Sequence, residues 1–135
     1  MTTIKYDFNE LVNKSQKTIT KKENLLSYNE FLNIDFKLLK SKGIVYFIYV
    51  KEKETFVLKY IGRSKGELFK TRITNHFHHK HKKTGSKIKE IKKAKANGKS
   101  VKLNFLITEP ASLRTLLETE LILKNNQTLW NMQKG

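Results

Sequence analysis

Two apolar runs near the middle of the chain predict β-strands joined as a hairpin. Residues 44–50 are β-branched or aromatic throughout, and residues 56–61 are apolar apart from one lysine. Such residues favour strands, and the charged residues between the two runs indicate a turn. If the turn centres on Lys53, Tyr46 lies directly opposite Tyr60. Opposed residues share one face of a hairpin, so we expect the two phenol rings to lie side by side.

Beyond this hairpin the apolar spacing changes to that of helices, with one further strand. Phe69, Ile73 and Phe77 recur every four residues, which is typical of the apolar side of an amphipathic helix. Residues 101–107 resemble a third strand because apolar and polar positions mostly alternate, and residues 113–124 predict a final helix. This order predicts a compact α+β fold with a three-stranded antiparallel sheet flanked by helices.

The residues before the hairpin form a weakly patterned segment of mixed charge. Thr20 with Glu23, and Ser27 with Glu30, have the spacing of capping boxes and stand just before apolar residues. A capping box satisfies the free N–H groups at the start of a helix. Short helices are therefore expected at both places.

The length of the chain fits one domain. With 135 residues, two separate cores would each be too small to be stable. We therefore assign residues 43–135 to a single domain, with a basic insert at about residues 78–100. Residues 1–42 are assigned to a partly helical arm that packs on this domain or contacts DNA.

The composition excludes several kinds of protein. The chain has no cysteine, so it has no disulfide, thiolate metal site or thiol nucleophile. No apolar run approaches the roughly 20 residues of a membrane span. The first 22 residues are polar and lack the apolar segment of a signal peptide. We expect a protein of the cytoplasm, in a bacterial or phage-infected cell.

The charge balance indicates a polyanionic partner. The formal net charge is +16, which favours nucleic acid first and an anionic membrane surface second. No predicted helix combines a wide apolar face with its lysines, so membrane binding is disfavoured. The chain has only three arginines among its 28 basic residues: Arg63, Arg72 and Arg114. In a lysine-rich chain, a position that holds arginine instead is notable.

The segment from Lys80 to Lys102 contains ten lysines and one acidic residue. It either follows a DNA backbone or forms a solvated helix face, and its place just after the helix that carries Arg72 favours the first. The expected contacts with DNA phosphates come from Arg63, Lys65, Lys80, Lys82, Lys83 and Lys87. The nearby histidines His76, His78, His79 and His81 also permit a structural zinc site, which the lack of cysteine disfavours.

Five sets of residues occur in an order that resembles the GIY-YIG nuclease family. These are Val45-Tyr46-Phe47-Ile48, Tyr60-Ile61-Gly62, Arg72 with His76, Glu118, and Asn131. The resemblance covers about residues 44–133. It departs from the family pattern at Ile44, where glycine is usual, although Gly43 stands one residue earlier.

Two details of the resemblance are more specific. The segment Leu117-Glu118-Thr119-Glu120-Leu121, with the later Trp130-Asn131, is similar to the C-terminal part of the small phage endonuclease II branch. The spacing of Arg72 and His76 resembles that of GIY-YIG restriction endonucleases. The resemblance implies hydrolysis of phosphodiester bonds in double-stranded DNA. Because each chain would hold one site, cutting both strands is easiest for a homodimer on DNA.

The resemblance also implies roles for individual residues. Glu118 would bind Mg²⁺, or alternatively Mn²⁺, because a hard ion held by one carboxylate keeps waters and can neutralise a phosphate. Glu120 is the alternative ligand, since periodicity does not choose between the two. Arg72 would bind phosphate oxygens through two parallel hydrogen bonds. Tyr46 would orient or deprotonate the attacking water, with neighbouring cations lowering its pKa.

The remaining roles are open. His76 either hydrogen-bonds Tyr46 or approaches a phosphate oxygen, and Asn131 orients Glu118 or a phosphate. Tyr46 and Tyr60 also fit ordinary half-buried strand aromatics. A nucleic-acid-binding protein without catalysis is therefore the alternative to an endonuclease. The biological role stays open among phage DNA degradation, restriction, homing and repair.

Overall fold

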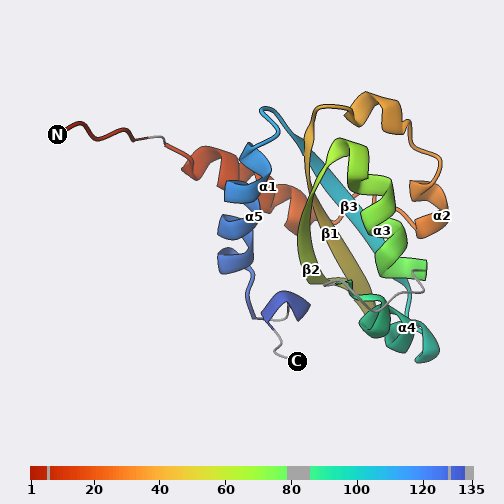
Figure 1. Ribbon diagram of the computed structural model, residues 1–135. Helices are drawn as coiled ribbons and strands as arrows, with labels where there is room; N and C mark the ends of the chain where they lie inside the picture. The colour runs from red at the N-terminus through yellow and green to blue at the C-terminus, as the bar shows by residue number, and fades with distance from the viewer. Residues whose placement is uncertain (6, 79–85, 128, 133–135) are drawn as a thin grey trace.

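A three-stranded antiparallel sheet forms the centre of the molecule, with the strand order β2-β1-β3 (Figure 1). The strands are β1 (Gly43–Glu52), β2 (Thr55–Lys65) and β3 (Val101–Thr108). The computed structural model describes residues 1–5, 7–78, 86–127 and 129–132. Helices flank the sheet, so the predicted α+β class is confirmed.

Helices cover both faces of the sheet, which explains why the apolar run of the central strand is continuous rather than alternating. In Figure 1, α1 (Asn9–Lys21) and α5 (Leu113–Lys124) lie to the left of the sheet. The helices α2 (Tyr28–Phe31), α3 (Phe69–His78) and α4 (Ile88–Ala96) lie to its right. β1 is buried on both sides along its first eight residues. A strand with both faces covered reads as a near-continuous apolar run.

Each face of the sheet has its own apolar core. The core beside α3 and α4 includes Tyr46 and Ile48 of β1 with Phe69 and Ile73 of α3. The core beside α1 and α5 contains these residues: Val45, Phe47, Tyr49, Val12, Ile19, Leu117 and Leu121. Alternate side chains of one strand point to opposite faces, so β1 contributes to both cores.

The register of the hairpin differs from the prediction. Tyr46 pairs with Gly62 rather than with Tyr60, and Tyr60 pairs with Ile48. A two-residue turn follows Glu52, where Lys53 has a φ of 57°, and a bulge lies between Ile48 and Tyr49. The predicted register centred the turn on Lys53 rather than between Lys53 and Glu54, and it included no bulge.

The bulge decides which face the second tyrosine joins. Without it, the ladder from the turn would pair Tyr60 with Phe47 and direct its ring toward α5. One extra residue in β2 shifts the register, so Tyr60 joins the core that contains Tyr46. The predicted neighbourhood of the two phenols is therefore confirmed, with ring centroids 6.1 Å apart, by a different register.

The N-terminal residues pack into both cores. The hydroxyl of Tyr49 donates to the carbonyl of Ile19 at 2.9 Å, which fixes α1 against β1. Phe31 of α2 is fully buried in the other core. The capping box predicted at Ser27 and Glu30 is confirmed at the start of α2. The helix start predicted at Thr20 is wrong, because α1 ends there and the Thr20 hydroxyl donates to carbonyls one turn earlier.

The described residues also form three short 3-10 helices: η1 (Phe36–Leu39), η2 (Gly66–Leu68) and η3 (Trp130–Met132). The helix η1 packs against η2, and η3 lies against β2. Within the described part of the chain, no helix is long and apolar enough to cross a membrane.

Candidate active site

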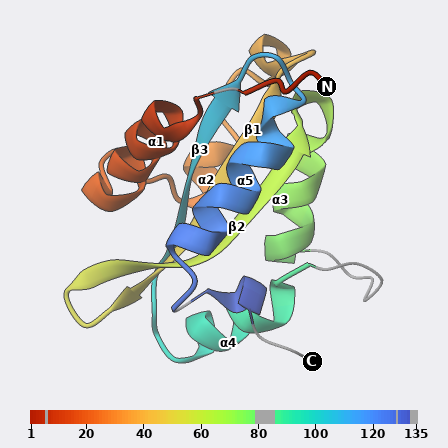
Figure 2. The same cartoon turned by 90° about the vertical axis from the view of Figure 1, so that its left-hand side faces the viewer.

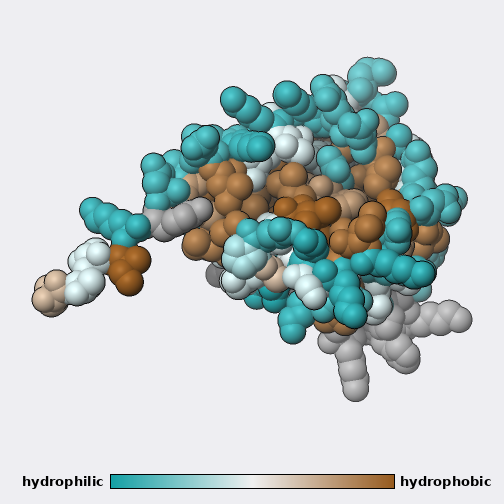
Figure 3. Space-filling model, turned by 90° about the horizontal axis from the view of Figure 1, so that it is seen from above, coloured by the Kyte–Doolittle hydropathy of each residue, from teal (hydrophilic) through white to brown (hydrophobic). Residues whose placement is uncertain are grey.

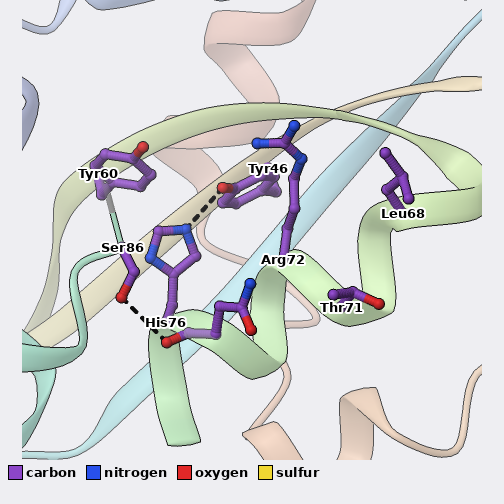
Figure 4. Close-up of a pocket in the computed structure, with 8 residues that line it drawn as sticks. Tyr46, Tyr60, Leu68, Thr71, Arg72, His76 and Ser86 are labelled. Atoms are coloured by element: carbon purple, nitrogen blue, oxygen red, sulfur yellow. Dashed lines mark hydrogen bonds between the residues drawn. The ribbon is translucent and has the colours of Figure 1, made fainter. Parts of the chain in front are cut away.

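The candidate site lies on the edge strand β2, which runs between α3 and α5 (Figure 2). Two neighbouring cavities, of about 330 and 420 Å³, share Tyr46, Tyr60, Leu68 and Arg72 in their walls. The first cavity extends along α3 toward His76 and Ser86, as Figure 4 shows. The second extends toward α5 and has these further lining residues: Arg63, Ser64, Lys65, Arg114 and Glu118. The strand edge thus brings groups from both faces of the sheet together.

Gly62 allows the ring of Tyr46 to reach the site from the central strand. Tyr46 lies on β1 and is only 2% exposed, while the cavities open beyond β2. Its ring crosses the backbone of Gly62, where a Cβ atom would lie 2.3 Å from Cζ and 2.5 Å from Oη of Tyr46. No side chain fits at such distances. The glycine of the Tyr60-Ile61-Gly62 motif is therefore required by the path of the Tyr46 ring.

A buried hydrogen-bonded chain fixes the Tyr46 hydroxyl. Oη of Tyr46 lies 2.8 Å from Nε2 of His76, and Nδ1 of His76 accepts the backbone N–H of Lys87 at 2.9 Å. Burial lowers the pKa of His76 to about 4, aided by the positive charges of Lys87 and Arg72. A neutral imidazole that accepts at Nδ1 carries its proton on Nε2. His76 therefore donates to Tyr46 and does not act as its base.

Of the two roles that the sequence left open for His76, the hydrogen bond to Tyr46 is confirmed. Figure 4 shows the imidazole between Tyr46 and Ser86, with its ring turned toward the phenol. The side chain is buried, so it is held away from bulk solvent. The geometry makes His76 a donor that stabilises negative charge on the Tyr46 oxygen.

The expected lowering of the Tyr46 pKa is wrong for the free protein. Burial raises the pKa of Tyr46 well above its ordinary value, and the neighbouring Tyr60 adds to this, while Arg72 opposes it. Burial also raises the pKa of Tyr60, and the negative charge of Glu118 acts in the same direction. The sequence revealed the cations around the phenol but not its degree of burial. Both tyrosines are neutral phenols in the free protein at physiological pH.

All three arginines of the chain line the larger cavity. Arg63 comes from β2, Arg72 from α3 and Arg114 from α5, and Lys65 adds a fourth cation. The other basic residues of this lysine-rich chain are all lysines. Guanidinium groups offer paired donors that match phosphate oxygens better than ammonium groups do. The arrangement favours an anion with several oxygens.

Arg114 is a member of this set that the sequence prediction did not assign to the site. It lies in the first turn of α5, where the helix dipole disfavours a cation. Its guanidinium donates to the carbonyl of Ala111 at 2.7 Å, which holds the side chain beside the helix end. The scarcity of arginine and its unfavourable place in the helix were the available signals.

Glu118 is the carboxylate that the fold brings to the two tyrosines. It lines the larger cavity with Tyr46 and Tyr60, and its side chain is 13% exposed. Glu120, two residues further along α5, faces a different cavity beside α1. Of the two carboxylates that the sequence left open, only Glu118 is placed where it can act with the tyrosines.

The residues present fit a hard divalent ion only in a limited way. Among the described residues, no group of three or more His, Cys, Asp or Glu side chains could hold a metal. Of the residues that the structure describes, Glu118 is the single carboxylate lining its cavity, and Arg63 already donates to its Oε1 at 2.6 Å. One carboxylate suits Mg²⁺, which keeps several waters and often shares its coordination with a substrate phosphate. An ion at Glu118 would have to share this carboxylate with Arg63 or displace Arg63.

Asn131 has a structural position: its side chain contacts the backbone of Ile61 rather than Glu118, and its expected contact with a phosphate stays a prediction. Its amide donates from Nδ2 to the carbonyl of Ile61 at 2.7 Å, and its Oδ1 accepts the N–H of Ile61 at 3.0 Å. Ile61 lies on the edge strand, whose outer backbone groups lack a neighbouring strand. Asn131 satisfies these groups and so fixes β2 between Tyr60 and Gly62.

The expected DNA-contacting lysines are only partly described. Lys65 lines the larger cavity, and the ammonium of Lys87 lies 5.8 Å from the centroid of the Tyr60 ring, a cation–π distance. Three others, Lys80, Lys82 and Lys83, lie outside the described residues, as do His79 and His81. The remaining histidine of this segment, His78, packs on the ring of Tyr28.

Comparison with protein-family models, with curated proteins and with solved structures found no match for this chain. The chemistry of the site therefore follows from its own groups. Four cations surround one carboxylate and two phenols, so the larger cavity carries a net positive charge. Such a cavity is suited to a phosphate group of a larger molecule, with an oxygen-bearing side chain beside it.

Proposed function

We propose that the chain is a metal-dependent DNA endonuclease of the GIY-YIG type, which hydrolyses phosphodiester bonds in double-stranded DNA. One observation carries the proposal: Tyr46, Tyr60, Arg72 and Glu118 come from four different elements and line one cavity. These are the residues for which the resemblance implies a site. A net charge of +16 on the whole chain supports a polyanionic substrate.

Arg72 binds the phosphate that is to be cut. Its side chain lines both cavities, and Figure 4 shows it rising from α3 beside the ring of Tyr46. Arginine stays protonated at any physiological pH, so the site keeps this charge throughout the reaction. Arg63 and Lys65 contribute further positive charge where the phosphate oxygens lie. Charge stabilisation in a partly enclosed site is commonly the largest contribution to such catalysis.

Tyr46 handles the proton of the attacking water. Its Oη receives a hydrogen bond from Nε2 of His76, and this bond favours negative charge on the oxygen. Arg72 acts in the same direction against the effect of burial. A divalent ion at Glu118 would add positive charge beside the phenol, which would then lose its own proton to solvent through the cavity and accept one from the attacking water. Tyr60 lies beside it and orients the water or a phosphate oxygen.

Glu118 would hold a Mg²⁺ or Mn²⁺ ion, which supplies neutralisation of the phosphate charge and assistance to the leaving oxygen. Arg63 is the residue that responds to such binding, because it contacts the same carboxylate. Its side chain is 47% exposed and free to turn toward a phosphate when Glu118 changes partner. Cutting both strands would need two such sites, and a dimer on DNA provides them.

The experiment that tests this proposal uses supercoiled plasmid and two matched variants of α5. Purified protein is expected to nick or linearise the plasmid with Mg²⁺ and to stop when EDTA is added. Glu118→Gln should lower the rate at least about a hundredfold. Glu120→Gln, on the same helix but facing another cavity, should leave the rate unchanged. Equal rates for both variants would remove Glu118 from the reaction.

A second candidate function, nucleic-acid binding without catalysis, is favoured by two observations. In the free protein Glu118 is already paired with Arg63, and burial keeps the Tyr46 hydroxyl protonated. A site with Glu118 in an ion pair and Tyr46 protonated is in a resting state without catalytic activity. Salt-sensitive DNA binding without cleavage under any divalent ion would support the second candidate over the first.

A further inference from the structure

Two short helices next to the candidate site are locked together by their backbones. The N–H of Gly66 in η2 donates to the carbonyl of Lys42 at 2.9 Å, and Glu67 accepts the N–H of Ser41 at 2.7 Å. A Cβ atom on Gly66 would lie 1.7 Å from the carbonyl oxygen of Leu39, so the backbones of η1 and η2 touch. This contact makes the two helices one rigid unit.

Each of these helices exposes a leucine to solvent. Leu38 of η1 is 70% exposed and Leu68 of η2 is 45% exposed. Leu68 lines both cavities of the candidate site, and Figure 4 shows it at the edge of the cavity near Arg72. The view from above in Figure 3 shows apolar side chains gathered on this end of the molecule between hydrophilic ones. We call Leu38 and Leu68 together the leucine pair.

Lysine side chains lie near the leucine pair. The positive charges of Lys65 and Lys40 both lower the pKa of Glu67, after its hydrogen bonds, so both ammonium groups lie near η2. Lys70 extends from α3 over the ring of Phe36 in η1, 5.5 Å from its centroid. Lysine also stands beside Leu38 at position 37. Two acidic groups belong to these helices, and each accepts a backbone N–H: Glu67 that of Ser41, and Asp35, which caps η1, that of Lys37.

Exposed apolar side chains within a basic surface are suited to one kind of partner. Proteins that bind the minor groove insert leucine or similar side chains between base steps while lysine and arginine hold the flanking phosphates. A second copy of this chain, with its net charge of +16, would be repelled by the same lysines. The charge therefore favours duplex DNA over a second copy of this basic chain.

We propose that the leucine pair contacts bases or deoxyriboses beside the bound phosphate and unstacks the adjacent base step. Leu68 provides the contact nearest the reacting groups, and Leu38 extends it along the duplex. The rigid backbone of η1 and η2 allows the side chains to act as a wedge, since a mobile loop would yield instead. This inference rests on the proposed function, because it places DNA in the neighbouring cavity.

The experiment compares Leu38→Ser/Leu68→Ser with Leu123→Ser. Leu123 is also exposed, at 61%, but lies on α5 beside a different cavity. Binding of a short duplex is measured in EDTA at several salt concentrations. The double variant should bind roughly tenfold more weakly, as expected for the loss of about one buried leucine. Its salt dependence should not change, whereas Lys65→Gln should lower the slope by about one phosphate contact.

A duplex that contains 2-aminopurine reports the unstacking. Wild-type protein and Leu123→Ser should raise its fluorescence, and the double serine variant should not. If the double variant binds the duplex and raises the fluorescence as the wild type does, the inference is overturned and the proposed function stays intact. Absence of duplex binding by the wild type would overturn both. If the wild type sediments as a dimer and the double variant as a monomer with unchanged duplex binding, the pair is a protein interface and the inference is wrong.

Discussion

The two sides of strand β2 prepare the same site in different ways. On the side of α3, Tyr46 and His76 are buried and joined by a hydrogen bond of 2.8 Å. On the side of α5, Arg63 and Glu118 form an ion pair of 2.6 Å in which Arg63 is about half exposed. One side is fixed by packing and desolvation, and the other is held by charges that remain near water.

The difference assigns separate tasks to the two sides. A buried pair has its geometry set before any ligand arrives, and its electrostatic effects are strong because water is excluded. An exposed ion pair contributes little to stability and can exchange partners at low cost. The buried side is therefore suited to positioning a proton-transferring group, and the exposed side to admitting an ion and a phosphate. Substitutions on the two sides should differ in what they change.

The largest effect is expected from Gly62→Ala on the buried side. The new methyl group would overlap the Tyr46 ring, which cannot retreat because it packs against Phe69 and His76. Overpacking of this kind costs about 2–3 kcal/mol of unfolding free energy, and the displaced phenol should remove activity. Chemical denaturation and plasmid cleavage measure the two losses.

Gly98→Ala provides the control for that variant. The position has a φ of 75° and open space around it, so alanine there costs about 1 kcal/mol through backbone strain alone. Its cleavage rate should remain that of the wild type. A Gly62→Ala protein with full activity would show that the Tyr46 ring does not need its path across β2.

Tyr46→Phe should separate chemistry from packing. The ring remains, so the stability loss is limited to about 1–3 kcal/mol from leaving His76 without its acceptor. The cleavage rate should fall by about two to four orders of magnitude, the usual contribution of a proton-transferring group. Tyr49→Phe is the matched control, because it removes a buried hydroxyl bonded to Ile19 on the other face. Similar losses of rate in both variants would make Tyr46 a packing residue.

The order of the elements follows from the sequence because apolar periodicity is local. The strands, α3 and α5 all occur where the spacing predicted them. The hairpin register is not local. It depends on the turn and on a bulge between Ile48 and Tyr49, and nothing in the residue types there distinguishes a bulged strand from a regular one. The two phenols were placed together correctly from an incorrect register.

The candidate site was predictable to the extent that residue type determines role. The motif spacing gave Tyr46, Tyr60 and Arg72, and the fold chose Glu118 over Glu120 because a helix wheel does not show which neighbour faces a cavity. The tautomer of His76 depends on the backbone N–H of a residue eleven positions away. Such long-range hydrogen bonds leave no trace in spacing, as the contacts of Asn131 with the backbone of Ile61 also show.

His76 should make stability depend on pH. Its pKa is about 4 in the folded protein against 6.5 ordinarily, so the unfolded chain binds the proton more readily between these values. The stability that the buried neutral His76 contributes is therefore fully present above pH 6.5. It is lost as pH falls toward 4, which lowers the free energy of unfolding by about 3 kcal/mol. Carboxylates titrate in the same range, so the measurement is the difference between wild type and His76→Gln in urea denaturation. Parallel curves for the two proteins would contradict the buried neutral imidazole.

The smallest effect on stability is expected from Arg63→Met on the exposed side. Because Arg63 is about half exposed, the unfolding free energy should change by no more than about 1 kcal/mol. Ligand binding should change in opposite directions: Mn²⁺ measured by electron paramagnetic resonance should bind several-fold more tightly to the freed Glu118, while DNA should bind more weakly with a salt slope lower by about one. Arg114→Met is the control. Because Arg114 donates to the carbonyl of Ala111, this variant should weaken DNA binding and leave Mn²⁺ binding unchanged. Unchanged Mn²⁺ binding in Arg63→Met would mean that Arg63 does not compete with an ion for Glu118, and the exposed side would then be as fixed as the buried one.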